Sequence, residues 1–242
     1  MKNAVVILAA GFGKRFLDST SSEIKDRTLK QFLNINGKPV FLWSVETFAS
    51  IKSFEQIIVA VPPKMVKTLS LEYEKCKLGF VFVSGGNERF ESVKNALSII
   101  ENDIDFVALH DAARPLISRE DILEVLKSAE KTGAAIATEK TKDTIKLVSG
   151  VCGKTGRYVL KTLDRTFLRN AQTPQIFEFN LLKRAYLIKK ISSTVTDDSQ
   201  LVEKLKVKVS VVETKFPNFK ITTKQDFKIA EALFAFKSRV FK

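Results

Sequence analysis

The sequence predicts an α/β fold with a mostly parallel sheet flanked by helices. Short apolar runs alternate with amphipathic stretches along the chain, a pattern typical of strands joined by crossover helices. Glycine-rich turns follow several of the apolar runs, at the positions where α/β sheets place ligand-binding loops. Of the 242 residues, 45% are hydrophobic, so the chain can bury a sizeable core without disulfides. We expect residues 1–242 to form one domain.

Each predicted core element rests on a local pattern. The helix Pro39–Ile51 begins with proline in its first turn, and Ser118–Thr132 carries apolar residues on one face before Gly133 ends it. The core strands are short apolar runs bounded by turn residues. They are expected at Ala4–Ala10, Gln56–Val61, Gly79–Val83, Asp105–Leu109 and Ala134–Thr138.

The pattern changes after the last of these strands. Lys140–Val148 resembles a strand, Ser149 and Gly150 a turn, and Tyr158–Leu163 a returning strand. We therefore expect residues 139–164 to form a β-arm that protrudes from the core. Asp197 and Gln200 have the spacing of a helix capping box. The remaining expected elements are helices at Phe179–Lys190 and Ser199–Leu205, a strand at Lys208–Glu213, and a terminal helix with Phe227, Ala230, Leu233 and Phe234 facing inward.

Cysteine content and hydropathy exclude several classes of protein. Cys76 and Cys152 lie far apart without a CxxC motif, which argues against a disulfide framework or a structural zinc site and indicates a reducing, cytoplasmic location. The apolar run Ala4–Ala10 is far shorter than the roughly 18 residues of a membrane-spanning helix. No small-residue cleavage site follows it, so a buried strand explains the run better than a signal peptide. We expect no membrane association.

The formal net charge of +13 permits an anionic ligand but does not identify one. Lysines are scattered along the chain and paired with glutamates, and no basic block of five or six residues occurs. This distribution favours a solvated surface over a nucleic-acid interface. A nucleic-acid-binding module is nevertheless the alternative from a different class, and it predicts an affinity that falls steeply with salt.

Three segments rich in glycine or charge follow predicted strands and should meet at one edge of the sheet. The first, Ala9–Arg15, has neither GxGxxG nor Walker A spacing, so a phosphate-binding loop and an ordinary turn both stay open for it alone. The second, Gly85–Ser92, leads into a helix. In the third, His110–Pro115, an aspartate can hold a metal or ribose and an arginine can pair with a phosphate. We expect His110, a lone histidine, to be structural.

Taken together, these segments and Lys30–Leu33 resemble, in order and content, the 2-C-methyl-D-erythritol 4-phosphate cytidylyltransferase family of the non-mevalonate isoprenoid pathway. The resemblance spans essentially the whole chain. Its motifs are AAGFGKR at 9–15, KQFL at 30–33, GGNERFESV at 85–93, HDAARP at 110–115, DT at 143–144, DR at 164–165, TPQ at 173–175, TDD at 196–198 and NFKIT at 218–222.

The resemblance implies a Rossmann-like fold of the nucleotidyltransferase type and a Mg²⁺-dependent reaction, with other divalent cations possible. A cytidylyl group would pass from CTP to the phosphate of the sugar alcohol, with release of pyrophosphate. The attacking phosphate oxygen is already an anion, so catalysis needs positioning and charge neutralisation rather than a general base. The resemblance also implies a homodimer, in which the arm clasps a second subunit and completes its acceptor site.

Site residues carry over from the resemblance position by position. Arg15 and Lys30 would stabilise the transition state, Arg165 and Lys220 would hold the acceptor phosphate, and Asp111 would lie near the Mg²⁺. The expected nucleotide-binding residues are Ala9, Ala10, Gly11, Gly13, Gly86, Asn87, Ser92, Asp111 and Ala112. The expected acceptor-pocket residues are Arg114, Thr144, Thr173 and Thr196.

Two departures from the family pattern leave alternatives open. Asn87 stands where an acid is usual, and its amide oxygen can accept the N4 hydrogen of cytosine as a carboxylate would. Residues 16–29 exceed the family pattern by about one or two helical turns, which makes Lys25 a rival to Lys30. The closest alternative function is ribitol 5-phosphate cytidylyltransferase, for which AGG would be expected at 9–11 and HDAVR at 110–114.

Overall fold

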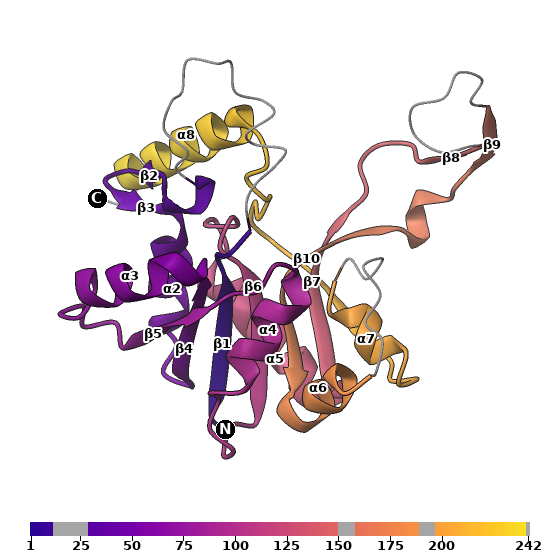
Figure 1. Cartoon of the computed structure of the whole chain (residues 1–242). Coiled ribbons are helices and arrows are strands. Elements are labelled where there is room, and N and C mark those ends of the chain that lie inside the picture. Colours follow the sequence, from indigo (N-terminus) through magenta and orange to yellow (C-terminus); the bar gives the residue numbers. More distant parts are fainter. Residues whose placement is uncertain (12–28, 150–157, 189–196, 241–242) are drawn as a thin grey trace.

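A seven-stranded sheet forms the centre of the molecule, in the strand order β11-β7-β10-β6-β1-β4-β5 (Figure 1). The computed structural model describes residues 1–11, 29–149, 158–188 and 197–240. All neighbouring strands of this sheet run parallel, except that β10 is antiparallel to both β6 and β7. The predicted mostly parallel α/β fold is therefore confirmed. The strands are β1 (Asn3–Leu8), β4 (Phe54–Val61), β5 (Phe80–Ser84), β6 (Phe106–Asp111), β7 (Ala134–Lys140), β10 (Arg169–Glu178) and β11 (Ser210–Glu213).

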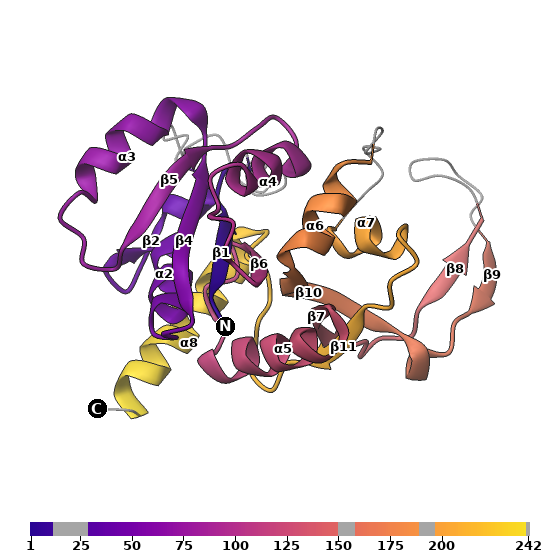
Figure 2. The same cartoon turned by 90° about the horizontal axis from the view of Figure 1, so that it is seen from below.

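Helices cover both faces of the sheet (Figure 2). On one face lie α2 (Val40–Ala49), α3 (Val66–Glu72) and α5 (Arg119–Thr132); on the other lie α4 (Arg89–Leu97), α6 (Phe179–Tyr186) and α7 (Ser199–Glu203). The limits of α5 confirm the predicted signals. Ser118 Oγ accepts a hydrogen bond from the backbone N–H of Asp121 at 3.0 Å, and Gly133 ends the helix with φ of 80°.

Strand β1 shows why the sheet is apolar on both faces. Its residues alternate between two clusters, so that Val5 packs in the cluster that contains Phe41 of α2, and Val6 in the cluster that contains Val93 of α4. All four side chains are fully buried. A strand covered by helices on both faces needs the near-continuous apolar run that the sequence contains.

A third apolar cluster packs beside the carboxyl edge of the sheet. It joins the C-terminal helix α8 (Lys224–Val240) to β2 (Asn34–Ile35) and β3 (Lys38–Pro39), a two-stranded sheet that follows the short 3-10 turn η1 (Lys30–Phe32). Trp43 stacks on Phe234 with the ring centroids 4.2 Å apart. The expected inward face of α8 is confirmed, because Ala230 and Phe234 are buried and Phe227 and Leu233 pack against the same cluster. This cluster holds Leu33 and Ile35, which directly follow η1, while Phe32 of η1 packs against the cluster that contains Phe41.

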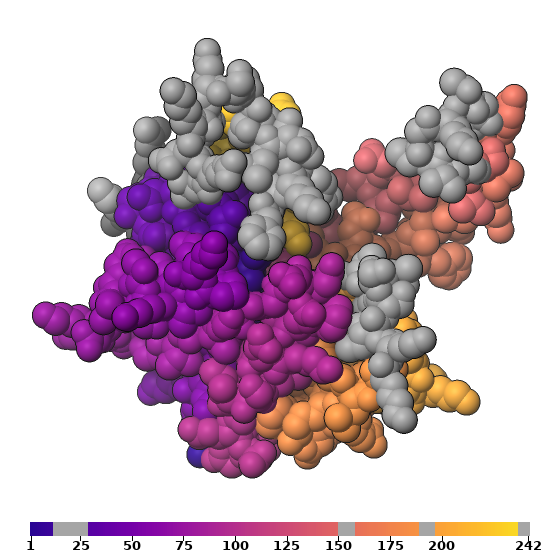
Figure 3. All heavy atoms as spheres, in the orientation of Figure 1, coloured from indigo at the N-terminus to yellow at the C-terminus, as the bar shows by residue number. Residues whose placement is uncertain are grey.

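Two further antiparallel strands, β8 (Lys146–Val148) and β9 (Val159–Thr162), project from the body as a separate two-stranded sheet (Figures 1 and 3). We call residues 139–164 the arm. Its strands are shorter than expected, because β7 continues to Lys140 and β8 begins only at Lys146. The arm is joined back to the body by the 3-10 turn η3 (Arg165–Phe167).

Strand β10 is absent from the sequence-based expectations, although it lies in the middle of the sheet. It contains Pro174, and proline within a run of residues argues against a central strand. The pairing of β10 with β7 shifts register between Ala171 and Gln175, so the proline falls where the ladder is interrupted. The remaining 3-10 turn is η2 (Pro63–Met65). Among the residues described, no helix is long and apolar enough to cross a membrane.

Candidate active site

A cavity of about 400 Å³ opens at the carboxyl edge of the sheet, between the end of β1 and the segments that follow β5 and β6. We call it the rim cavity. Residues predicted from four separate motifs line it together with Lys220 from the segment before α8. The predicted site residues on its wall are Ala10, Gly11, Lys30, Gly86, Asn87, Ser92, Asp111 and Lys220.

The loop after β1 is tied to η1 by a buried glutamine. Gln31 Nε2 donates hydrogen bonds to the carbonyl oxygens of Ala9 at 2.6 Å and Gly11 at 3.0 Å. The Lys30 ammonium, one residue earlier, donates to the carbonyl of Ile221 and lies on the cavity wall. Gln31 thus fixes the position from which Lys30 reaches the cavity. It has no assigned role in the sequence-based expectations, although it follows Lys30 within the KQFL motif.

The loop after β5 requires two glycines because other side chains approach its backbone closely. A Cβ added at Gly85 would lie 2.2 Å from Ala10 Cβ, and one added at Gly86 would lie 2.2 Å from Glu91 Cβ. The backbone N–H of Gly86 donates to Ser92 Oγ at 3.0 Å, so Ser92 both lines the cavity and shapes the loop. The loop is therefore held by contacts within the protein itself.

A second cavity of about 500 Å³ adjoins the rim cavity. Pro62, Pro63 and Phe90 line it, and it shares Ala10, Gly86 and Asn87 with the rim cavity. Asn87 thus lies where it can contact a ligand in either space. This is the region in which the resemblance places the cytosine.

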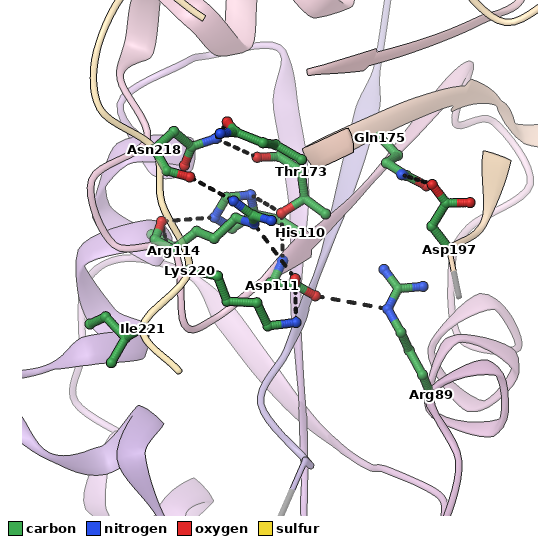
Figure 4. Close-up of polar contacts among 12 residues, drawn as sticks. Arg89, His110, Asp111, Arg114, Thr173, Gln175, Asp197, Asn218, Lys220 and Ile221 are labelled. Carbon is green, nitrogen blue, oxygen red and sulfur yellow. Dashed lines mark hydrogen bonds and ion pairs between the residues drawn. The ribbon is translucent and has the colours of Figure 1, made fainter. Parts of the chain in front are cut away.

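Three cations surround the carboxylate of Asp111 at the end of β6 (Figure 4). Lys220 Nζ lies 2.8 Å from Oδ2, Arg114 Nε 3.7 Å from Oδ2, and Arg89 Nε 3.8 Å from Oδ1. Burial alone would raise the pKa of Asp111, but Lys220, Arg89 and Arg114 lower it to well below its ordinary value. Arg89 also pairs with Asp198, so these three cations face two carboxylates, and the remaining positive charge suits a polyanionic ligand.

Behind Asp111, a histidine and a threonine form a hydrogen-bonded support. Thr173 Oγ1 accepts from the backbone N–H of Asp111 at 3.0 Å and lies 3.2 Å from His110 Nδ1, while His110 Nε2 lies 3.2 Å from the carbonyl oxygen of Arg114. A carbonyl only accepts, so Nε2 carries the proton and Nδ1 accepts from Thr173. Burial lowers the pKa of His110 to about 4, so the ring is neutral at pH 7. These contacts agree with the structural role expected for His110.

The other predicted site residues lie at different distances from the rim cavity. Ala9 and Ala112 are buried beneath it. Arg114 donates from Nη1 to the carbonyl oxygen of Asn218 at 2.7 Å. Thr144 and Arg165 are exposed at the base of the arm and line neither cavity, and Arg165 Nη1 donates to the carbonyl oxygen of Lys142 at 2.7 Å. Predicted residues that lie outside the described part of the chain are Gly13, Arg15, Lys25 and Thr196.

Asp111 can offer a magnesium ion one carboxylate, so substrate phosphates and waters would have to supply most of the ligands of the metal. Within the described ranges, no group of three or more histidine, cysteine, aspartate or glutamate side chains could hold a metal ion. Mg²⁺ is usually bound by one or two carboxylates together with substrate phosphates and waters. Asp111, an ionised carboxylate on the cavity wall, is a candidate for that single protein ligand.

Comparison with known proteins gives a consistent result. Residues 3–235 match the family model of 2-C-methyl-D-erythritol 4-phosphate cytidylyltransferase. The enzyme of that name from Endomicrobium trichonymphae is 64% identical over 96% of this chain and 99% of its own length. The crystal structure of 4-diphosphocytidyl-2C-methyl-D-erythritol synthase from Anaerococcus prevotii superimposes with a TM-score of 0.79 at 28% identity, covering 97% of this chain and 98% of that chain.

The Thermus thermophilus structure of 2-C-methyl-D-erythritol 4-phosphate cytidylyltransferase agrees with a TM-score of 0.74 at 30% identity, covering 97% of this chain and 100% of that chain. Sequence match, fold and the convergence of the motifs on one cavity all point the same way. The chain therefore belongs to the 2-C-methyl-D-erythritol 4-phosphate cytidylyltransferase family, whose members transfer a cytidylyl group from CTP to that sugar-alcohol phosphate.

Proposed function

We propose that the rim cavity binds the triphosphate of CTP beside the phosphate of 2-C-methyl-D-erythritol 4-phosphate and catalyses cytidylyl transfer with Mg²⁺. One observation carries the proposal: Lys30, Asp111 and Lys220, from distant parts of the sequence, line a single cavity next to Gly86. A phosphate oxygen of the acceptor attacks the α-phosphorus of CTP, and the bond to the leaving pyrophosphate breaks. The new bond joins two phosphates of the cytidine diphosphate product.

Lys30 is assigned to the nucleotide side of this reaction. Lys30 lines the same cavity as Gly11, so its ammonium group can neutralise charge that builds on the triphosphate as pyrophosphate leaves. The family resemblance assigns Arg15 to the same task. Gly11 and Gly86, one from each glycine-rich loop, lie on the same cavity wall, so the backbone of both loops can approach a nucleotide bound there.

Lys220 is assigned to the acceptor side. Its hydrogen bond to Asp111 holds the ammonium group on the cavity wall, where it can bind and orient the attacking phosphate. Mg²⁺, held by Asp111 together with triphosphate oxygens, would supply further positive charge to the same phosphates. No general base is required, because the attacking oxygen is ionised at neutral pH.

A homodimer would bring Arg165 to the acceptor site of the partner subunit. The arm supports this assignment, because it carries apolar side chains that its own chain leaves exposed, including Tyr158 at 73% and Leu160 at 62%. Exposed apolar surface of this kind is typical of an interface. The exposed Arg165 begins η3, which directly follows the arm in the sequence. The cytoplasmic location expected from the cysteine content stays a prediction.

Pyrophosphate release measured with CTP and each acceptor tests the proposed function. We expect rapid release with 2-C-methyl-D-erythritol 4-phosphate and Mg²⁺, and little release with ribitol 5-phosphate. The reverse preference would contradict the proposal and favour the ribitol enzyme. Omission of divalent ions should abolish release. A filter-binding titration with duplex and single-stranded DNA should show no salt-sensitive affinity.

A further inference from the structure

Arg89 occupies a position that helix stability does not explain. It is the first residue of α4, directly after the capping residue Glu88. The N-terminal end of a helix carries partial positive charge, so a cation in the first turn is unfavourable for the helix itself. The side chain is only 30% exposed and lies on the wall of the rim cavity. Its placement therefore calls for partners elsewhere in the fold.

Those partners are two carboxylates from different parts of the chain, of which Figure 4 shows Asp111. Arg89 Nη1 donates a hydrogen bond to Asp198, which precedes α7, and Arg89 Nε lies 3.8 Å from Asp111 Oδ1 at the end of β6. Burial alone would lower the pKa of Arg89, but Asp198 and Asp111 together raise it, so the guanidinium stays charged. A planar guanidinium has nitrogens that can face both carboxylates at once, which a single ammonium group cannot reproduce.

Asp198 is a fixed anchor for this contact. Its side chain is 3% exposed, and the hydroxyl group of Tyr186 from α6 donates to its second carboxylate oxygen. The backbone N–H groups of Asp198 and Ser199 both donate to Gln175 Oε1 at 3.1 Å. Gln175 belongs to β10 and is itself buried. The anchor is thus attached to the sheet and to α6, and Arg89 extends that attachment to the cavity wall.

We propose that Arg89 is a positioning residue that links Asp198 to Asp111 and to the nucleotide loop, and thereby sets the separation of the two substrate phosphates. The inference rests on the proposed function of the rim cavity. Arg89 directly follows the Gly85–Glu88 loop, so holding its side chain holds the end of that loop. Asp111 in turn holds Lys220, which is assigned to the acceptor. A shift of the guanidinium would displace both sides of the reaction.

The simpler alternative is that Arg89 and Asp198 form a buried ion pair that only docks α7 on the body. Removing one partner of such a pair leaves an uncompensated buried charge and destabilises the fold. Loss of activity after removal of one charged side chain would therefore not distinguish a positioning role from a purely structural one. The test therefore needs variants that preserve charge balance.

Two variants of the full-length protein make this separation. In Arg89→Lys, the ammonium group retains charge beside Asp198 but cannot also face Asp111. In the double variant Arg89→Gln with Asp198→Asn, neither buried charge remains unpaired. We expect both proteins to melt cooperatively close to the wild-type temperature, while kcat for pyrophosphate release falls about 10- to 100-fold, as expected for misplaced reactants. KM for CTP should rise by a smaller factor than kcat falls, because the loop shifts but the triphosphate contacts of Lys30 remain.

Lys127→Gln is the matched control, because it removes one positive charge from an exposed position on α5. It should leave kcat, KM and melting temperature unchanged. Wild-type kcat in both Arg89→Lys and the double variant would overturn the inference and leave Arg89 a purely structural role. If Arg89→Lys failed to melt cooperatively, the kcat of the double variant would decide. Pyrophosphate release by the wild-type enzyme is measured in the same experiment. If the wild type released none, the proposed function itself would be contradicted.

Discussion

The rim cavity and the arm depart from an ordinary protein surface in opposite ways. At the rim, charged and polar side chains such as Asp111 and Asp198 are buried and paired with partners from the same chain. On the arm, apolar side chains such as Tyr158 and Leu160 are exposed. Buried polar groups and exposed apolar groups are the placements that carry information about function. The rim is therefore largely completed within one chain, whereas we expect the arm to be completed by a second copy.

The largest expected effect is on the rim. Lys30→Ala should lower kcat for pyrophosphate release about 10²- to 10³-fold, as expected for loss of one donor to the developing charge. The fold should persist, because the loop after β1 is held by Gln31 rather than by the lysine side chain. Lys25→Ala serves as the matched comparison and should retain nearly normal turnover. If the two variants behaved in the opposite way, the triphosphate role would belong to Lys25.

Subunit complementation tests the link between rim and arm. Lys220→Ala and Arg165→Ala should each be nearly inactive alone. When the two chains are co-expressed, about a quarter of wild-type activity per subunit should return, because half of randomly mixed dimers are mixed pairs and each has one intact site. No recovery in a verified mixed dimer would place Arg165 at the site of its own chain. A monomer mass by light scattering would contradict the dimer itself.

A smaller effect is expected from the packing beneath the cavity. Gly85→Ala should lower the free energy of unfolding by about 1–3 kcal/mol, because the new methyl group would overlap Ala10 Cβ. The displaced loop should also bind CTP more weakly. Gly11→Ala is the comparison for stability, since a Cβ there meets no atom of the described residues within 4 Å. Equal melting temperatures for the two variants would show that the loop yields easily.

The smallest effect concerns pH. His110 has its pKa lowered by burial to about 4, from an ordinary value of 6.5. Above pH 6.5 the ring is neutral in both states, so it adds no pH dependence. Between pH 6.5 and 4 only the unfolded chain takes up the proton, so stability falls by about 1.4 kcal/mol per pH unit. Urea titrations across this range should show that the free energy of unfolding depends less on pH in His110→Gln than in the wild type. An identical pH dependence in the two proteins would contradict the assignment of this effect to His110.

The fold and most of the cavity could be predicted because their signals are local. A buried strand followed by a glycine-rich turn is recognisable within about ten residues, which is how Ala9–Gly11 and Gly85–Ser92 were assigned to one edge. The Arg89–Asp198 contact joins positions 109 residues apart and depends on how α7 docks. Strand β10 was hidden by Pro174, because a single sequence does not show that the ladder is interrupted there.

In the arm, too, the local sequence could not locate the strand boundaries. The run Lys140–Val148 resembles one strand in sequence, yet β7 ends at Lys140 and β8 begins at Lys146. Local propensity alone could not locate this break, because strand pairing depends on what each residue packs against. The exposed apolar residues of the arm could be recognised only after folding showed that the body does not cover them.

A crystal structure with CTP and Mg²⁺ tests the central claim most directly, because the observable is which side chains reach the triphosphate. We predict the triphosphate inside the rim cavity, with Lys30 Nζ at hydrogen-bonding distance and the cytosine beside Gly86 and Asn87. Triphosphate density outside this cavity, or a phosphate contact from Lys25 with Lys30 turned away, would contradict the account.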